Sequence, residues 1–195
     1  MLRDVMSYEI LLASGSPRRR ELMKELEIPF RVVDTGHTDE VYPSGLAGGD
    51  IALYLAGQKS DAYADPLSDR QVLLTADTIV WHGEQELGKP ANRDEAISMI
   101  SRLSGTTHQV FTGVCLRSET KRTGFIAVTD VTFARFDADE VAYYVDKFKP
   151  YDKAGAYGIQ EWIGHIGVER INGSYFNVMG LPVQKVYSEL KAFIR

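Results

Sequence analysis

The fold is decided by the stretch Leu11-Leu12-Ala13-Ser14-Gly15-Ser16-Pro17-Arg18-Arg19-Arg20-Glu21. The apolar run over residues 10–13 indicates a buried strand, which breaks at Ser14-Gly15. Ser16 is a preferred helix N-cap residue, and Pro17 is well suited to the first helical position. The stretch therefore predicts a strand, a tight loop and the start of a helix.

The arginines at positions 18–20 occupy the first turn of this helix. Exposed N–H groups and the macrodipole already make a helix amino end positive, so cations there are unfavourable. An anion such as phosphate would resolve the conflict if the hydroxyls of Ser14 and Ser16, main-chain N–H groups and the arginines held it. The alternative is a surface helix with solvated arginines, and we favour the anion site.

The composition is that of an ordinary globular chain of 195 residues, with 44% hydrophobic and 25% charged residues. We expect one domain over residues 1–195 that can contain two lobes. The net charge of −5 argues against a general binder of nucleic acid or of anionic membranes. The lone cysteine, Cys115, excludes a disulfide within the chain, and no apolar stretch approaches the ~20 residues of a membrane span. We therefore expect a cytoplasmic protein.

Hydrophobic periodicity and capping residues predict helices and strands along the rest of the chain. The predicted helices cover residues 17–27, 50–64, 92–104, 137–145 and 182–193. Asn92 caps the third of them, Asp137 and Glu140 form a capping-box-like start of the fourth, and the last has an inward apolar stripe. The predicted strands cover residues 30–33, 71–76, 108–116, 124–133 and 166–171, and strand character resumes at 79–81. The strands at 108–116 and 124–133 should form an antiparallel pair. Residues 34–49 are a long loop, and loops of this length are often functional.

Carboxylates and cations are the candidate site residues. Asp77 follows the strand at 71–76, and ligand sites in α/β sheets gather at the carboxyl ends of strands. Lys59 lies on the apolar face of the helix at 50–64, either as a functional lysine or as a stem with a solvated head. Glu40 and Lys89 lie in charged loops. This set suits a triphosphate, because cations neutralise phosphoryl oxygens while carboxylates hold Mg²⁺ or Mn²⁺ and activate water.

Several familiar sites lack their signatures. The sequence has no GxxxxGK[ST], no GxGxxG after a strand, no GxSxG and no HExxH motif. The four histidines are scattered and do not pair with Cys115 at metal-ligand spacing, so we do not expect a zinc site.

The motifs occur in one order along nearly the whole chain. They are Ser14-Gly15-Ser16-Pro17-Arg18-Arg19, Lys59, Ala76-Asp77-Thr78, Gly88-Lys89-Pro90, Leu103-Ser104-Gly105, Asp152-Lys153-Ala154-Gly155-Ala156-Tyr157-Gly158-Ile159-Gln160, Ile171-Asn172-Gly173-Ser174-Tyr175 and Gly180-Leu181-Pro182. With them the sequence resembles the Maf family of nucleoside triphosphate pyrophosphatases, in particular its dTTP/UTP pyrophosphatase branch. One departure follows Gln160, where Glu161-Trp162 replaces the glycine-rich sequence common in the family.

The resemblance implies an α/β fold with a mixed sheet in two lobes around a deep cleft, like that of inosine triphosphatases, and often a homodimer. It implies a catalytic base at Asp77, specificity positions at Arg18, Thr78 and Gln160, phosphate-binding positions at Ser14, Arg19, Lys59 and Lys89, and metal ligands at Glu40 and Asp77. Asp39 could stand in for Glu40.

From these residues we expect a metal-dependent hydrolase that cleaves a nucleoside triphosphate to the monophosphate and pyrophosphate. The Gln160 carboxamide could pair with both N3–H and O4 of uracil or thymine, while cytosine would need the amide flipped. CTP would then be a weaker substrate, and modified pyrimidine nucleotides are further candidates. The alternative is a nucleotide-binding regulator of cell division or septum formation without turnover, a role also associated with the family.

Overall fold

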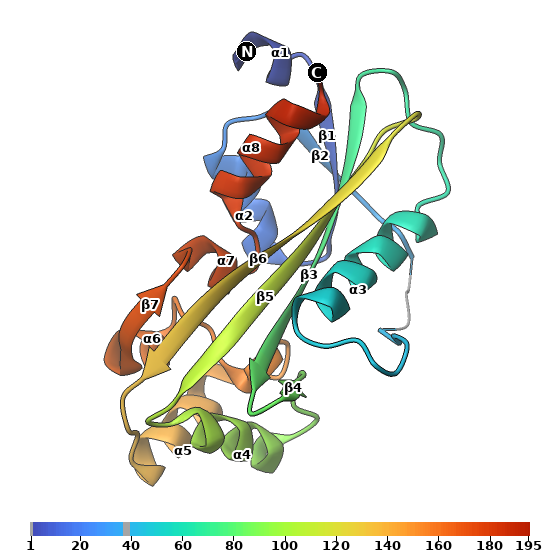
Figure 1. Cartoon of the computed structure of the whole chain (residues 1–195). Coiled ribbons are helices and arrows are strands. Elements are labelled where there is room, and N and C mark those ends of the chain that lie inside the picture. Colours follow the sequence, from blue (N-terminus) through green and yellow to red (C-terminus); the bar gives the residue numbers. More distant parts are fainter. Residues whose placement is uncertain (1, 37–39) are drawn as a thin grey trace.

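The computed structural model describes residues 2–36 and 40–195 (Figure 1). In these residues seven strands form one mixed sheet in the order β2-β1-β3-β5-β6-β7, with β4 paired beside β3. The strands are β1 Glu9–Ala13, β2 Phe30–Val33, β3 Gln71–His82, β4 Gln85–Leu87, β5 Thr107–Arg117, β6 Arg122–Phe133 and β7 Val168–Asn172. Strand β1 runs parallel to β2 and β3, and all other pairs are antiparallel. The predicted antiparallel pair is therefore confirmed as β5 and β6.

The helices lie on both faces and at both ends of the sheet. They are α1 Leu2–Val5, α2 Pro17–Glu25, α3 Gly49–Ala62, α4 Arg93–Leu103, α5 Ala138–Phe148, α6 Trp162–Gly167, α7 Tyr175–Met179 and α8 Val183–Phe193, with a short 3₁₀ helix η1 at Ala154–Ala156. No described helix is long and apolar enough to cross a membrane, since the longest, α3, has 14 residues.

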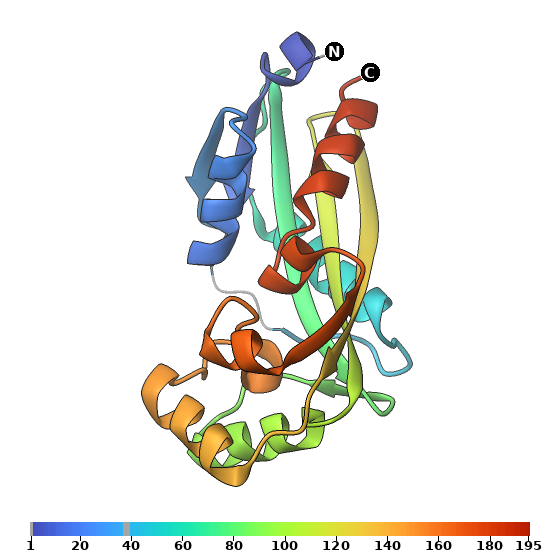
Figure 2. The same ribbon diagram turned by 90° about the vertical axis from the view of Figure 1, so that its left-hand side faces the viewer.

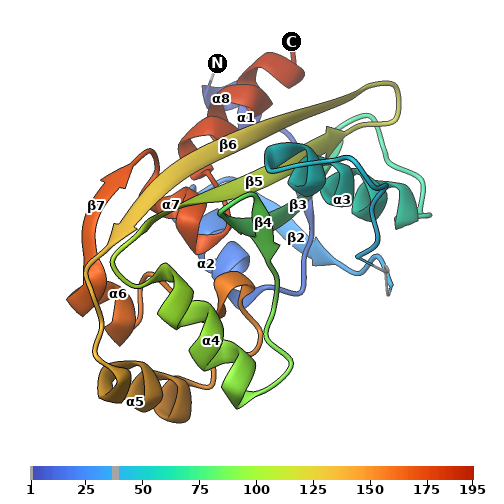
Figure 3. The ribbon, with the colours of Figure 1, turned by 60° about the horizontal axis from the view of Figure 1, so that its bottom comes forward.

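Two lobes share the three long strands β3, β5 and β6, which run almost the full length of the molecule (Figure 2). Helices α2 and α8 cover one end of the sheet, and α4 and α5 lie side by side at the other end (Figure 3). The predicted two-lobed α/β fold with a mixed sheet is confirmed.

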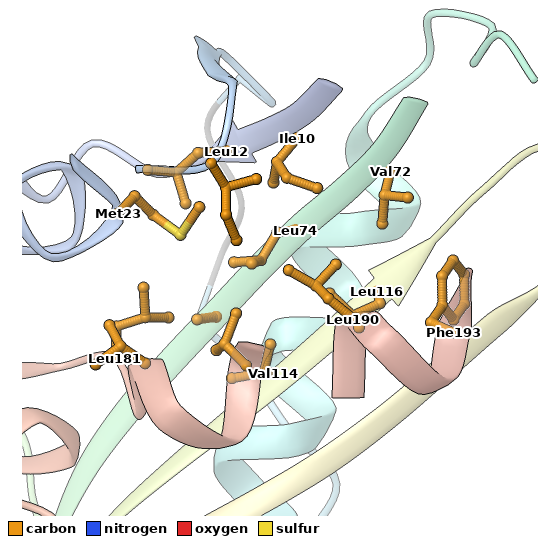
Figure 4. Packing of buried hydrophobic residues seen from close by; sticks show 14 of the residues in the cluster. Ile10, Leu12, Met23, Val72, Leu74, Val114, Leu116, Leu181, Leu190 and Phe193 are labelled. Carbon is orange, nitrogen blue, oxygen red and sulfur yellow. The ribbon is translucent and has the colours of Figure 1, made fainter. Parts of the chain in front are cut away.

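The core of the first lobe forms between the sheet and helices α2 and α8 (Figure 4). Leu190 and Phe193 of α8 are buried together with Leu74 of β3 and Leu116 of β5. Side chains alternate across a strand, so Leu73 instead joins a smaller cluster with Tyr63, at the end of α3 on the opposite face. The apolar stripe predicted for the last helix is therefore the face of α8 that covers the sheet.

The core of the second lobe is aromatic. Phe133, Tyr144 and Tyr157 are buried there among apolar side chains of α4 and α5. Local caps fix both helices: the Asn92 side chain accepts a hydrogen bond from Glu95 N at 3.0 Å, and α5 begins with a capping box. These caps are the ones that the sequence predicts.

Strand β3 differs from its prediction, because it does not end before Asp77. Its parallel partner β1 stops at Ala13, opposite Thr75, but β5 continues to pair with β3 as far as Trp81. Asp77 therefore lies within β3, just beyond the carboxyl end of β1.

Other boundaries shift by a few residues. Helix α2 ends two residues earlier than predicted, α3 covers 49–62 instead of 50–64, and α5 continues to Phe148. The strand predicted at 166–171 begins at Val168, because α6 occupies the residues before it. Helices α1 and α7 and strand β4 are not predicted from the sequence; each has five residues or fewer.

Candidate active site

A cleft of about 1460 Å³ lies between the two lobes. All nine residues that the sequence predicts for the site line this cleft, although they come from separate segments: Ser14, Arg18, Arg19, Glu40, Lys59, Asp77, Thr78, Lys89 and Gln160. The deep cleft expected from the sequence is therefore present, and the structure brings the predicted residues together in it. Their individual roles remain predictions.

The loop between β1 and α2 forms one wall of the cleft. Ser16 is the N-cap of α2, and its side chain accepts a hydrogen bond from Arg19 N at 3.4 Å. The Ser14 hydroxyl accepts a hydrogen bond from Ser16 N at 3.2 Å, which closes a tight turn before Pro17. The predicted strand, loop and helix start are confirmed.

The first-turn arginines do not extend freely into solvent. The Arg19 guanidinium donates to Gly180 O at 2.8 Å, to Ala76 O at 2.8 Å and to Thr78 Oγ1 at 2.9 Å. Arg18 pairs with Asp152 Oδ2 at 3.2 Å across the cleft. Three of the five N–H donors of Arg19 thus bind the protein itself. The alternative of simply solvated arginines is wrong for these two residues, and part of the charge conflict predicted for this helix is balanced by protein acceptors.

Lys59 occupies the centre of the charged cluster. Its ammonium donates to Asp77 Oδ1 and, at 3.3 Å, to Glu40 Oε1. The Lys59 side chain is 18% exposed and its ammonium is paired with carboxylates, so the head does not extend freely into solvent, while its functional role stays a prediction. Lys89 reaches the same Glu40 carboxylate, with Nζ 3.1 Å from Oε2. Two lysines and two carboxylates therefore form one cluster.

The pKa of Glu40 reflects this cluster. Burial acts to raise the pKa, but the charges of Lys59 and Lys89 and their hydrogen bonds outweigh it and hold the pKa below its usual value. Glu40 is therefore ionised at neutral pH.

The two carboxylates also fit a hard divalent cation. Glu40 and Asp77 both contact the Lys59 ammonium, so they face a common position that favours positive charge. Within residues 2–36 and 40–195 no group of three or more His, Cys, Asp or Glu side chains forms a complete cage. Mg²⁺ commonly takes one or two carboxylates and completes its shell with water and substrate phosphates, which suits this pair. Asp39, the alternative to Glu40, lies outside the described residues.

Gln160 lies in the cleft wall formed by the second lobe. Its Oε1 atom is buried and has no hydrogen-bond partner among the described residues. Buried amide oxygens are normally paired, so this atom can accept a hydrogen bond from a ligand. Thr78 is engaged by the protein, since its hydroxyl accepts from Arg19 and bonds the Thr112 hydroxyl at 2.9 Å.

Sequence reasoning missed the polar groups behind Gln160. Tyr144 binds both Gly158 N, at 3.0 Å, and the Glu161 carboxylate. Nothing in the sequence separates Tyr144 from the apolar stripe of its helix. Glu161 is visible in the sequence only as the departure from the family pattern.

Comparisons with known proteins find one family model and several relatives that match this chain over almost its full length. Residues 9–193 match the family described as Maf-like protein. Three relatives are each named dTTP/UTP pyrophosphatase. That of Parabacteroides distasonis is 53% identical over 193 residues, 99% of this chain and 100% of the relative. That of Bacteroides fragilis is 54% identical over 191 residues, covering 98% and 99%, and that of Flavobacterium johnsoniae is 45% identical over 195 residues, covering both chains fully.

Solved structures with a similar fold include two Ham1 proteins. The Staphylococcus aureus Ham1 protein gives a TM-score of 0.54 at 16% identity, over 95% of this chain and 99% of that chain. A HAM1 protein from Coxiella burnetii gives 0.50 at 14% identity, with the same coverage. At these identities the likeness concerns the fold alone, and it confirms the predicted fold class.

Proposed function

The chain belongs to the Maf-like protein family, and from this premise we propose that it is a pyrophosphatase that hydrolyses dTTP and UTP between the α and β phosphates. The names of relatives at 45–54% identity support this proposal. They favour turnover over a regulator that only binds nucleotide.

One observation carries the proposal for this chain: the Lys59 ammonium lies between Asp77 and Glu40 in the cleft that also holds Gln160. Lys59 holds Oδ1 of Asp77, and the carboxylate can accept a proton from water. The water oxygen then bonds to the α phosphorus while the bond from that phosphorus to the bridging oxygen breaks. Asp77 takes the proton, and the products are a nucleoside monophosphate and pyrophosphate.

Cationic side chains are placed to stabilise the charge that develops on the leaving pyrophosphate. Lys59 and Lys89 contact Glu40, and Arg18 lines the same cleft. A Mg²⁺ or Mn²⁺ ion held by Glu40 and Asp77 together with phosphate oxygens would polarise the phosphoryl group and lower the pKa of bound water.

We assign base recognition to Gln160, whose buried Oε1 can accept the N3–H of uracil or thymine while its NH₂ donates to O4. CTP would then be a weaker substrate, because its N3 is an acceptor.

The setting of the reaction is also part of the proposal. The net charge of −5 supports a free nucleotide as partner in preference to nucleic acid or membrane, and the free, buried Cys115 suits the cytoplasm. We propose a homodimer, for which the exposed side chains of Val128, Tyr175 and Phe176 offer apolar surface. Light scattering of the purified chain measures its oligomeric state.

A pyrophosphate-release assay tests the function directly. The panel contains dTTP, UTP, CTP, dATP, GTP and a methylated guanosine triphosphate, each with Mg²⁺ or Mn²⁺ and with a chelator. The proposal requires dTTP and UTP to have the highest kcat/KM and the chelator to abolish turnover. Faster hydrolysis of the methylated guanosine nucleotide would contradict the assignment of Gln160, and binding without pyrophosphate release would contradict the enzyme itself.

A further inference from the structure

The side chains of Tyr144, Glu161 and Lys153 form a series of polar contacts next to the loop that carries Gln160. The Tyr144 hydroxyl accepts a hydrogen bond from Gly158 N at 3.0 Å and donates one to Oε2 of Glu161. The other carboxylate oxygen of Glu161, Oε1, lies 3.2 Å from Lys153 Nζ. Tyr144 comes from α5, so these contacts attach the Gln160 loop to the second lobe.

The same series of contacts reaches the first lobe. Lys153 Nζ also lies 2.8 Å from Asp152 Oδ1, and Arg18 Nη1 lies 3.2 Å from Asp152 Oδ2. Arg18 and Gln160, both predicted to set specificity, are thus connected from opposite walls of the cleft through Asp152, Lys153 and Glu161.

Tyr144, Lys153 and Glu161 are too buried to be ordinary surface groups, whereas the Asp152 side chain is 62% exposed. Tyr144 is completely buried, and the side chains of Lys153 and Glu161 are 10% and 20% exposed. Burial and the bond to Glu161 raise the pKa of Tyr144, so the phenol stays protonated and donates. Buried charges are retained only when they are paired, and each member here has a partner.

The loop backbone packs directly on Glu161. A Cβ atom on Gly158 would lie 2.8 Å from Glu161 Cδ and 3.0 Å from Oε2, closer than side chains normally approach. The carboxylate therefore fixes the position of the backbone two residues before Gln160. Oε1 of Gln160 has no hydrogen-bond partner among the described residues, so no bond at this atom holds the amide in one direction, and the backbone sets only where the side chain starts.

We propose that Glu161 is a positioning residue for base specificity: through Tyr144 and Gly158 it positions the Gln160 carboxamide so that uracil and thymine are preferred to cytosine. This inference rests on the proposed function. Glu161 acts through the loop, without itself touching the base.

Two substitutions test the inference with little change of shape. Glu161→Gln removes the charge, and Tyr144→Phe removes the hydroxyl that binds Gly158 N. Matched controls come from the exposed face of α5, the helix that carries Tyr144. Asp146→Asn breaks the ion pair with Arg93, and Tyr143→Phe removes a hydroxyl bonded to Lys147. The assay measures kcat and KM for dTTP, UTP and CTP, with thermal unfolding recorded for every variant.

We expect each test variant to raise KM for dTTP and UTP about tenfold, with kcat changed by less than about twofold, because ground-state recognition of the base is what weakens. The preference over CTP should fall by about the same factor, while the controls keep the wild-type ratio. The double variant should resemble either single one, since both act on one contact.

The outcomes distinguish a failure of the role proposed for Glu161 from a failure of the proposed function. Equal losses on all three nucleotides, or a fall in kcat alone, would mean a merely structural role and overturn the inference. An unchanged dTTP-to-CTP ratio in Tyr144→Phe would overturn it even if Glu161→Gln failed to fold. If the wild-type chain does not prefer dTTP and UTP, the proposed function fails first, and the inference fails with it.

Discussion

Replacing Lys59 with Met tests whether the ammonium between the two carboxylates balances their charge. Methionine keeps most of the stem but removes the positive group. In the structure Nζ lies 3.3 Å from Glu40 Oε1 and contacts Asp77 Oδ1, and the Asp77 side chain is 10% exposed. The variant leaves two carboxylates facing each other with less compensation, so we expect it to be less stable.

The magnitude follows from the geometry. At 3.3 Å and an effective dielectric constant of about 20, the attraction between Lys59 and Glu40 is about 5 kcal/mol before desolvation, and solvent reduces it because the Glu40 side chain is 46% exposed. The buried partner of Lys59 is Asp77, whose side chain is 10% exposed. Removing one partner of a buried pair costs about 3–5 kcal/mol. Because the cluster opens into the cleft, we expect about 3 kcal/mol, which lowers the Tm of a chain of this size by roughly 6–12 °C.

The loss of stability in Lys59→Met should depend on pH. A carboxylate whose native pKa is lowered stabilises the fold above its unfolded pKa, and this stabilisation is lost as pH falls through the native pKa. Burial raises the pKa of Glu40 while Lys59 and Lys89 lower it, so removing Lys59 raises the pKa. The difference between variant and wild type should therefore be largest near pH 7 and shrink as pH falls toward about 4.

Circular dichroism during heating measures Tm at both pH values. Lys89→Met is the matched control, because Lys89 contacts the same carboxylate but its side chain is 53% exposed, and such pairs contribute less than about 1 kcal/mol. Added Mg²⁺ should raise the Tm of Lys59→Met more than that of the wild type, since a cation can replace the ammonium. Equal Tm values for Lys59→Met and the wild type at pH 7 would refute the charge-balance argument.

Three further predictions concern the site and its support. Asp77→Asn should lower kcat by about 10²–10⁴-fold while the protein still binds dTTP, as rapid kinetics and calorimetry measure; near-normal turnover would remove Asp77 from the mechanism. Burial, and after it the charge of His82, lowers the pKa of His108 to about 3, so the free energy of unfolding should fall by about 2 kcal/mol between pH 7 and pH 5 as the unfolded chain takes up the proton. His108→Gln should remove this part of the pH dependence, as denaturant titrations at several pH values measure. If the free energy of unfolding of His108→Gln changed with pH as much as that of the wild type, the explanation would be wrong. Gly113→Ala places a Cβ 2.2 Å from Leu53 N of α3 and should cost about 3 kcal/mol, whereas a Tm within 2 °C of wild type, roughly the change expected for under 1 kcal/mol, would show that α3 can move aside.

Local patterns predicted most of the larger elements. Ser16, Asn92 and Asp137 cap helices where the sequence places them, because capping depends on only a few neighbouring residues. Helix α7 shows how a local signal can be overlooked: the Ser174 side chain accepts from Asn177 N, and Gly180 ends the helix in a left-handed conformation, but five residues are too few for a periodic pattern.

Contacts between side chains from distant segments could not be predicted from local sequence patterns. The partners of Lys59 become visible only when α3, the loop at Glu40 and strand β3 are placed together, and its function stays a prediction. The same holds for Arg19, whose acceptors include Gly180, 161 residues away. Spacing shows that a side chain is unusual for its position, whereas its partner depends on how distant segments meet.

The sharing of β3, β5 and β6 between the lobes has a consequence for folding. Val114 and Leu116 of β5 belong to the first core, while Val110 of the same strand belongs to the second. Unfolding of either core would break hydrogen bonds between the strands on which the other core packs. The chain should therefore unfold in one cooperative transition. Nucleotide bound in the cleft should then protect backbone amides of both lobes from hydrogen exchange to a similar extent, including those far from the ligand.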